Sequence, residues 1–160
     1  SGGGLLREVT EVLFYHLERR TLDDVLPGLI ERTLERGWRA LIKADSADRA
    51  ATIDGLLWTY NEQTFLPHAQ MGDGDAKRQP VLITTEDENA NTANVLFLVG
   101  GAEPLPWDVP NNLTRIVLMF DGRDEASLGK ARASWKEAKA AGHDATYWKE
   151  QPSGKFEKQA

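Results

Sequence analysis

The sequence contains no cysteine. Disulfides, thiolate nucleophiles and cysteine-ligated zinc are therefore excluded, and the composition fits a cytoplasmic protein. No apolar run approaches the roughly 20 residues that span a membrane. No signal peptide is expected, and residues 1–8 are interpreted as a cloning remnant. The net charge of −6 makes the chain a poor non-specific ligand for DNA phosphates. A role with nucleic acid would run through another protein or through a local basic patch.

Short apolar segments alternate with amphipathic segments along the 160 residues, a length that suits one domain. The expected fold class is α/β, a single domain over residues 9–149 with a mainly parallel sheet and helices on both faces. Residues 150–160 are expected to form a disordered tail. The expected strands are 11–17, 39–44, 81–84, 95–99, 115–120 and 145–149; the expected helices are 24–36, one from a cap at Asp45 or Ser46 to residue 58, and 125–141.

The sequence offers little support for an enzyme or a metalloprotein. The turn at residues 18–21 has no glycine to let a backbone approach a pyrophosphate, and no P-loop is present. The three histidines, His16, His68 and His143, have no metal-ligand spacing, and structural roles are favoured for them. No cofactor and no metal are therefore expected. A small α/β enzyme with an unrecognised nucleotide or phosphoester site remains the alternative function.

A basic stripe stands out on the last expected helix, where four residues are spaced i, i+3, i+4 and i+7 and so lie side by side. It is a candidate site for an anionic, partly apolar partner. The alternative is a solvated face with the tryptophan tucked over the sheet. Direct binding of single-stranded nucleic acid would need cations interleaved with stacking aromatics, and only this short stripe qualifies. The stripe consists of Arg132, Trp135, Lys136 and Lys139.

A second patch follows the helix that runs to residue 58. One interpretation is a buried connection under the edge of the sheet. The other is an apolar docking surface, since tryptophan and tyrosine are favoured interface anchors. The patch includes Trp58, Phe65, Leu66, Pro67 and His68.

The order and spacing of several short motifs resemble the chi subunit family of the bacterial DNA polymerase III holoenzyme. The resemblance covers about residues 9–149. The motifs are Val12-Leu13-Phe14-Tyr15-His16-Leu17, Trp58 followed by Phe65-Leu66-Pro67-His68, Trp135-Lys136 with Gly142, and the closing Tyr147-Trp148-Lys149.

This resemblance implies a non-catalytic adaptor of the clamp-loader assembly, part of a DNA-directed DNA polymerase holoenzyme. The implied fold is like that of mononucleotide-binding α/β proteins, but no nucleotide is used. Chi subunits bind the acidic C-terminal tail of the single-stranded-DNA-binding protein, so their contact with DNA is indirect. A separate surface binds the psi subunit or, alternatively, a repair helicase.

Transferred to this sequence, the implied tail site falls on the last expected helix. Arg132 matches the arginine that holds the terminal carboxylate, Trp135 stands where the family often has tyrosine, and Lys136 matches the following lysine. Ala138 stands where some relatives carry another aromatic residue. Lys139, Lys130 and Leu128 complete the expected tail site, and Trp58, Phe65, Leu66, Pro67 and His68 form the expected psi or helicase surface.

Overall fold

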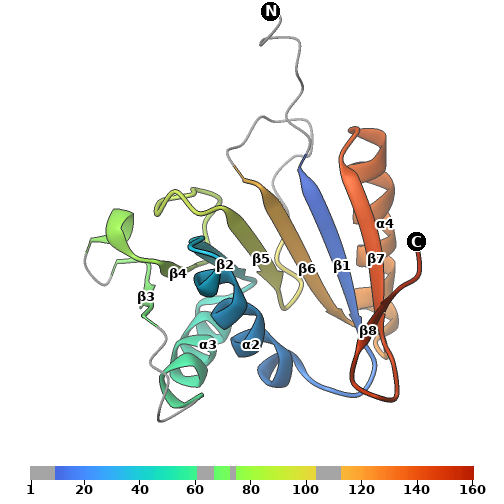
Figure 1. Cartoon of the computed structure of the whole chain (residues 1–160), viewed down its shortest axis with the longest axis horizontal. Coiled ribbons are helices and arrows are strands. Elements are labelled where there is room, and N and C mark those ends of the chain that lie inside the picture. Colours follow the sequence, from blue (N-terminus) through green and yellow to red (C-terminus); the bar gives the residue numbers. More distant parts are fainter. Residues whose placement is uncertain (1–9, 61–66, 73–74, 104–112) are drawn as a thin grey trace, which may run out of the picture.

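The computed structural model describes residues 10–60, 67–72, 75–103 and 113–160 (Figure 1). None of the helices in these ranges is long and apolar enough to cross a membrane. The elements are β1 (Glu11–Leu17), α2 (Leu22–Glu35), β2 (Ala40–Ala44), α3 (Ala47–Thr59), β3 (Ala69–Gln70), the 3₁₀ turn η1 (Ala76–Arg78), β4 (Val81–Thr84), β5 (Val95–Val99), β6 (Arg115–Asp121), α4 (Glu125–Ala140), β7 (Asp144–Glu150) and β8 (Phe156–Lys158).

One sheet contains all eight strands in the order β3-β4-β2-β5-β6-β1-β7-β8. Every neighbouring pair is parallel except β7 and β8, which form an antiparallel hairpin. The six expected strands are all present, and the short strands β3 and β8 are additional. The predicted α/β fold with a mainly parallel sheet is confirmed.

Helices lie on both faces of this sheet. Helices α2 and α3 share one apolar core with alternate residues of the strands, while α4 packs over a second core on the opposite face. Figure 1 shows α2 and α3 together toward the β2 side of the sheet and α4 beside β1 and β7. The strands are buried on both faces, which explains their nearly continuous apolar sequences.

Helix α2 begins two residues before the predicted start. The Asp24 carboxylate accepts the Thr21 N–H at 3.0 Å and the Thr21 hydroxyl at 3.1 Å, and this reciprocal contact sets the first turn. The expectation of a cap at Asp23 or Asp24 was therefore wrong. Pro27 lies inside the helix rather than in its first turn, and there its missing N–H costs one helical hydrogen bond.

The C-terminal segment differs most from the sequence-based expectation. Residues 150–160, expected to be a disordered tail, instead complete β7, turn at Gly154 and form β8. Two side chains anchor this hairpin: the Glu150 carboxylate, which is buried, and the Phe156 ring, which packs on Tyr15. The polar composition of this segment gives no sign of either anchor. Each anchor is recognised only through its contact with a residue far away in the sequence.

Candidate partner-binding site on helix α4

Helix α4 presents the basic stripe to solvent. Its first turn is capped by Asp124, whose carboxylate accepts the Ser127 hydroxyl at 2.6 Å and the Ser127 N–H at 3.1 Å. These two hydrogen bonds lower the pKa of Asp124. The helix ends before Gly142, whose φ of +87° favours glycine. The prediction of a helix over 125–141 is thus confirmed to within one residue.

The cations of the stripe are exposed to solvent and form no ion pair with any described residue. Arg132, Lys136 and Lys139 all lie at the surface. Among the ion pairs of the described residues, none involves any of these three side chains. Some other surface cations are paired, as Arg123 is with Asp121 at 3.0 Å. Among the described residues, no carboxylate therefore neutralises the positive charge of the stripe.

Trp135 is held at the border between this stripe and the sheet. Its ring meets Phe14 of β1 edge to face, with centroids 5.4 Å apart, and Tyr147 of β7 at 6.0 Å. The Lys139 ammonium lies 4.9 Å from the centre of the same ring. The ring thus packs over the sheet, as the alternative interpretation expected, and it is half-buried beside the cations.

Two other residues of the expected tail site lie apart from the stripe. Leu128 packs against the apolar core under α4. Lys130 turns toward the loop after β5, where its Nζ lies 3.4 Å from Oε1 of Glu103. A helix step of two residues points Lys130 and Arg132 in nearly opposite directions. Lys130 therefore lies on the other flank of α4.

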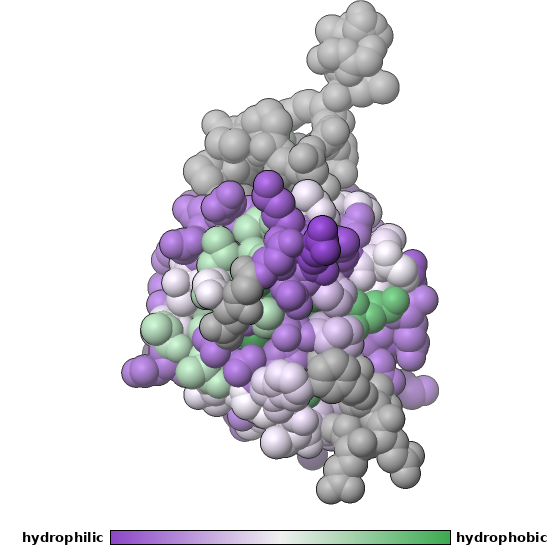
Figure 2. Space-filling view, turned by 90° about the vertical axis from the view of Figure 1, so that its left-hand side faces the viewer, coloured by the Kyte–Doolittle hydropathy of each residue, from purple (hydrophilic) through white to green (hydrophobic). Residues whose placement is uncertain are grey.

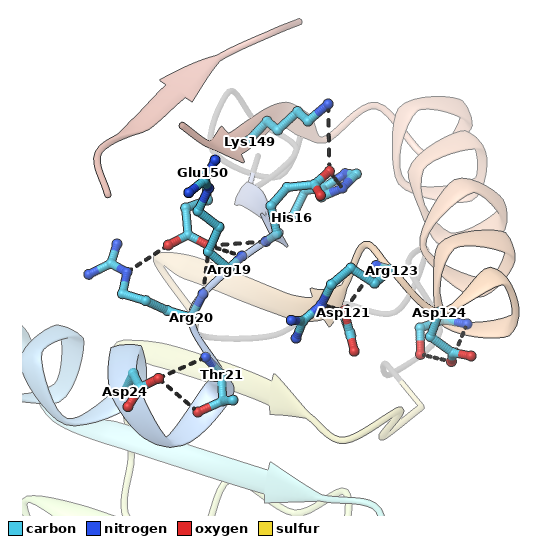
Figure 3. Close-up of polar contacts among 12 residues, drawn as sticks. His16, Arg19, Arg20, Thr21, Asp24, Asp121, Arg123, Asp124, Lys149 and Glu150 are labelled. Atoms are coloured by element: carbon cyan, nitrogen blue, oxygen red, sulfur yellow. Dashed lines mark hydrogen bonds and ion pairs between the residues drawn. The ribbon is translucent and has the colours of Figure 1, made fainter. Parts of the chain in front are cut away.

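A polar network that the sequence analysis did not assign lies next to Arg132. The Tyr147 hydroxyl lies 2.5 Å from Nδ1 of the buried His16, and His16 Nε2 lies 2.7 Å from Glu18. Burial raises the pKa of Tyr147, and the nearby charge of Arg132 opposes this effect. Figure 3 shows His16 of β1 and Lys149 of β7 directed at the same carboxylate, that of Glu18. His16 and Tyr147 are 131 positions apart in the sequence, so only the pairing of β1 with β7 could have revealed their contact.

The second patch lies at the other end of the sheet. Trp58 is 55% exposed, and its ring lies 4.7 Å from the ring of His68, which is buried. Pro67 is half-buried beside it. Figure 2 views this end, where apolar and polar surfaces are mixed. Phe65 and Leu66 lie outside the described residues.

The turn after β1 is already occupied by an internal anion. The backbone N–H groups of Glu18, Arg19 and Arg20 all donate to Oε1 of Glu150, at 3.0, 2.8 and 3.1 Å (Figure 3). A turn of this kind holds phosphate in nucleotide-binding α/β folds. Here the Glu150 carboxylate fills it, which argues against a nucleotide at this turn.

A cavity of about 660 Å³ opens nearby, at the carboxyl ends of β1, β5 and β6. Ligands often bind at this position in parallel α/β sheets. Four basic side chains line its wall, and each has an acidic partner. The pairs are Arg20 with Glu150, Arg49 with Asp45, Arg123 with Asp121 and Lys130 with Glu103. Within the described ranges, no three histidine, aspartate or glutamate side chains converge as metal ligands. Among the described residues, Lys130 is the one basic side chain of this wall with a loose ion pair, so the cavity offers little uncompensated positive charge for a phosphoester.

Comparison with known proteins identifies the family. The family model described as "DNA polymerase III chi subunit, HolC" matches residues 9–146. A curated protein of Rickettsia prowazekii (strain Madrid E), "Probable DNA polymerase III subunit chi", is 28% identical over 85 residues, which is 53% of this chain. The chain spans about half the length of that relative, 52%. With a family model matched along most of its length, the chain belongs to the DNA polymerase III chi subunit family, a family of non-catalytic subunits.

Proposed function

We propose that this chain is a non-catalytic adaptor of the polymerase clamp-loader assembly that works in the cytoplasm. In this role it binds the acidic C-terminal tail of single-stranded-DNA-binding protein and so links the polymerase to coated single strands. The observation that carries the proposal is the exposed stripe on α4, in which three cations without an ion pair among the described residues flank a half-buried tryptophan.

The stripe matches the chemistry of such a tail, which ends in a proline, a phenylalanine and a free carboxylate after several aspartates. The Arg132 guanidinium is suited to hold the terminal carboxylate through two parallel hydrogen bonds. The exposed edge of Trp135, with Tyr147 at 6.0 Å, offers an apolar surface to the phenylalanine ring. Lys136 and Lys139 attract the upstream aspartates.

The flank that carries Lys130 has a lesser role in this proposal. Lys130 is 63% exposed along its side chain, and its pairing with Glu103 is loose at 3.4 Å. An exposed pair of this kind contributes little free energy, so an acidic peptide is able to compete for the ammonium. Leu128 packs against the apolar core and so helps to hold α4 on the sheet.

A second partner is proposed for the surface around Trp58. The exposed Trp58 follows α3 and offers an apolar anchor at the β3 end of the sheet, away from α4 (Figure 1). Tyr60, at the end of α3, and Met71, after β3, are also exposed. Pro67 and His68 border this anchor. We assign it to a psi-like subunit or a repair helicase, which would then bind together with the tail.

The test is calorimetric titration with a peptide that copies the acidic tail of the host's single-stranded-DNA-binding protein. Saturable binding is expected for the wild type, with strong weakening in Arg132→Ala. Arg78→Ala is the matched control, because Arg78 is an exposed arginine on η1, remote from α4. An equal loss in both variants, or no binding to the wild type, would refute the proposal.

A further inference from the structure

The Tyr147 hydroxyl connects the surface beside helix α4 to a buried histidine. Tyr147 of β7 is half-buried on the α4 side of the sheet, and its ring lies 6.0 Å from that of Trp135. The hydroxyl oxygen lies 2.5 Å from Nδ1 of His16, on the neighbouring strand β1. Among the described residues, this ring is the only hydrogen-bond partner of the hydroxyl. Burial raises the pKa of Tyr147 and the charge of Arg132 opposes this rise, so the same hydroxyl lies within the influence of the arginine of the proposed tail site.

Glu18 sets the direction of the hydrogen bond between His16 and Tyr147. The Glu18 carboxylate lies 2.7 Å from Nε2 of His16. A carboxylate can only accept, so Nε2 carries the proton of the neutral ring, and Nδ1 is left as an acceptor. The Tyr147 hydroxyl then donates to Nδ1, and its oxygen has only lone pairs to offer elsewhere. In this state Tyr147 provides no donor for an anion at the surface.

Protonation of His16 reverses this hydrogen bond. An imidazolium donates from both nitrogens, so Nδ1 donates to the Tyr147 oxygen while Nε2 still donates to Glu18. The hydroxyl proton of Tyr147 then turns away from His16. One proton taken up from solvent at Nδ1 thus converts the hydroxyl from an acceptor into a donor toward the surface.

Charged groups of both signs surround this pair of residues. Lys149 of β7 lies 3.6 Å from the carboxylate of Glu18 that contacts His16 (Figure 3). On β6, the pKa of Asp121 is lowered mainly by its hydrogen bonds with Arg123 and to a smaller extent by His16. Imidazole is the side chain whose charge ordinarily changes between about pH 5 and 8. The charged groups that face the pair are Glu18, Lys149, Asp121, Arg123 and Arg132.

We infer that Tyr147 is a further residue of the tail site, and that protonation of His16 makes its hydroxyl a donor to the terminal carboxylate held by Arg132. The inference rests on the proposed function, because it concerns the same site. His16 is buried and acts through Tyr147, so it is a positioning residue. Binding of the tail should tighten as the pH falls from about 8 to about 5.5.

A hydroxyl donor suits a carboxylate that is already bound to an arginine. A carboxylate has about four lone-pair sites, and a bidentate guanidinium uses two of them. A buried imidazolium would also attract an anion by charge alone, without any hydroxyl. Tyr147→Phe separates the two effects, because it removes the hydroxyl and leaves His16 and the packing of the ring in place.

The experiment is calorimetric titration of the N-acetylated tail peptide at about pH 5.5 and about pH 8, at constant ionic strength. Over this range the carboxylates of the peptide stay ionised, and acetylation removes its titrating amine. The wild type is expected to bind about three- to tenfold more tightly at the lower pH. Tyr147→Phe and His16→Gln should each reduce this gain to less than about twofold, and a peptide with an amidated C-terminus should do the same.

The matched control is His143→Gln. His143 is a half-buried histidine before β7, and its Nδ1 accepts the Thr10 N–H at 3.2 Å. This variant should keep the full gain at low pH, and circular dichroism should show native folding for Tyr147→Phe and for the control.

Two kinds of failure are distinguishable. If the wild type binds the peptide equally well at both pH values, or if Tyr147→Phe keeps the full gain, the inference is overturned and the tail site stands. If His143→Gln loses the gain as well, the pH dependence is not specific to His16, and the inference is again overturned. If the wild type binds no peptide at either pH, the proposed function is overturned together with the inference.

Discussion

The Glu150 carboxylate accepts the backbone N–H of Arg19 at 2.8 Å across 131 residues of sequence. The same oxygen accepts two neighbouring N–H groups, and the second oxygen accepts Arg20 Nε at 2.7 Å. Burial alone would raise the pKa of Glu150, but the four hydrogen bonds from residues 18–20 lower it to about 2. One buried anion thus ties the C-terminal hairpin to the turn after β1.

Replacing this anion should destabilise the fold. Glu150→Gln removes the charge and puts an amide donor among N–H donors, so we expect the free energy of unfolding to fall by about 2–4 kcal/mol. Urea denaturation at neutral pH measures this loss. Glu157→Gln, an exposed glutamate on β8, is the control and should change stability by less than about 0.5 kcal/mol. Equal stability of the two variants would contradict the assigned role.

Stability should also depend on pH through Glu150. Its pKa is lowered on folding from 4.5 to about 2, so the unfolded chain takes up the proton first. The contribution is complete above about pH 4.5 and is lost as the pH falls through about 2. Other carboxylates add to the acid sensitivity, so the informative quantity is the difference between wild type and Glu150→Gln. That difference should shrink on acidification; a constant difference would show that the charge is not the cause.

Two glycine substitutions should have effects of opposite sign. A Cβ at Gly122 would lie 1.8 Å from Nε2 of His16, so Gly122→Ala forces His16 out of its contact with Glu18 and should cost about 1–3 kcal/mol. A Cβ at Gly129, inside α4, meets nothing within 4 Å. Gly129→Ala should therefore stabilise the protein by about 0.4–1 kcal/mol. Thermal unfolding of both variants is the measurement, and a stabilising Gly122→Ala would be inconsistent with the position of His16.

The tail site should respond to substitutions in a graded manner. Arg132→Ala is expected to cost on the order of 2–4 kcal/mol of binding free energy, because it removes a charge-assisted pair. Lys136→Ala should cost about 0.5–1 kcal/mol, and this loss should fade as salt rises. Amidating the C-terminus of the peptide should mimic Arg132→Ala, and the two changes together should cost little more than either alone. Additive losses in calorimetry would mean that another group holds the carboxylate.

The Trp58 surface should be separable from the tail site. Trp58 is 55% exposed, so Trp58→Ala should lower the free energy of unfolding by less than about 1 kcal/mol. Co-purification with a psi-like subunit or a helicase should weaken, while the affinity for the tail peptide stays within about twofold. A loss of tail affinity would show that the two surfaces are coupled or that the variant is misfolded.

Local patterns in the sequence determined the elements and the basic stripe. The bounds of β1, β4 and β5 coincide with their apolar segments, since strand periodicity depends only on neighbouring residues. The stripe on α4 is equally local, because residues three and four apart always adjoin on a helix. The cap at Ser46, which accepts the Arg49 N–H, is set by the same short-range chemistry.

The order of the strands decided which distant side chains meet, because it brings together residues that no local pattern connects. Only the placement of β1 between β6 and β7 puts Tyr147 against His16 and Glu150 under the turn after β1. The order β2-β5-β6 likewise brings the Arg115 guanidinium of β6 to 5.4 Å from the centre of the Trp38 ring, which precedes β2. Residues 150–160 looked like a tail because the partners that stabilise Glu150 and Phe156, which are Arg20 and Tyr15, lie at least 130 residues away. Such contacts form when the sheet assembles, so the identity of each partner depends on the crossovers between strands and not on the residues beside it in the sequence.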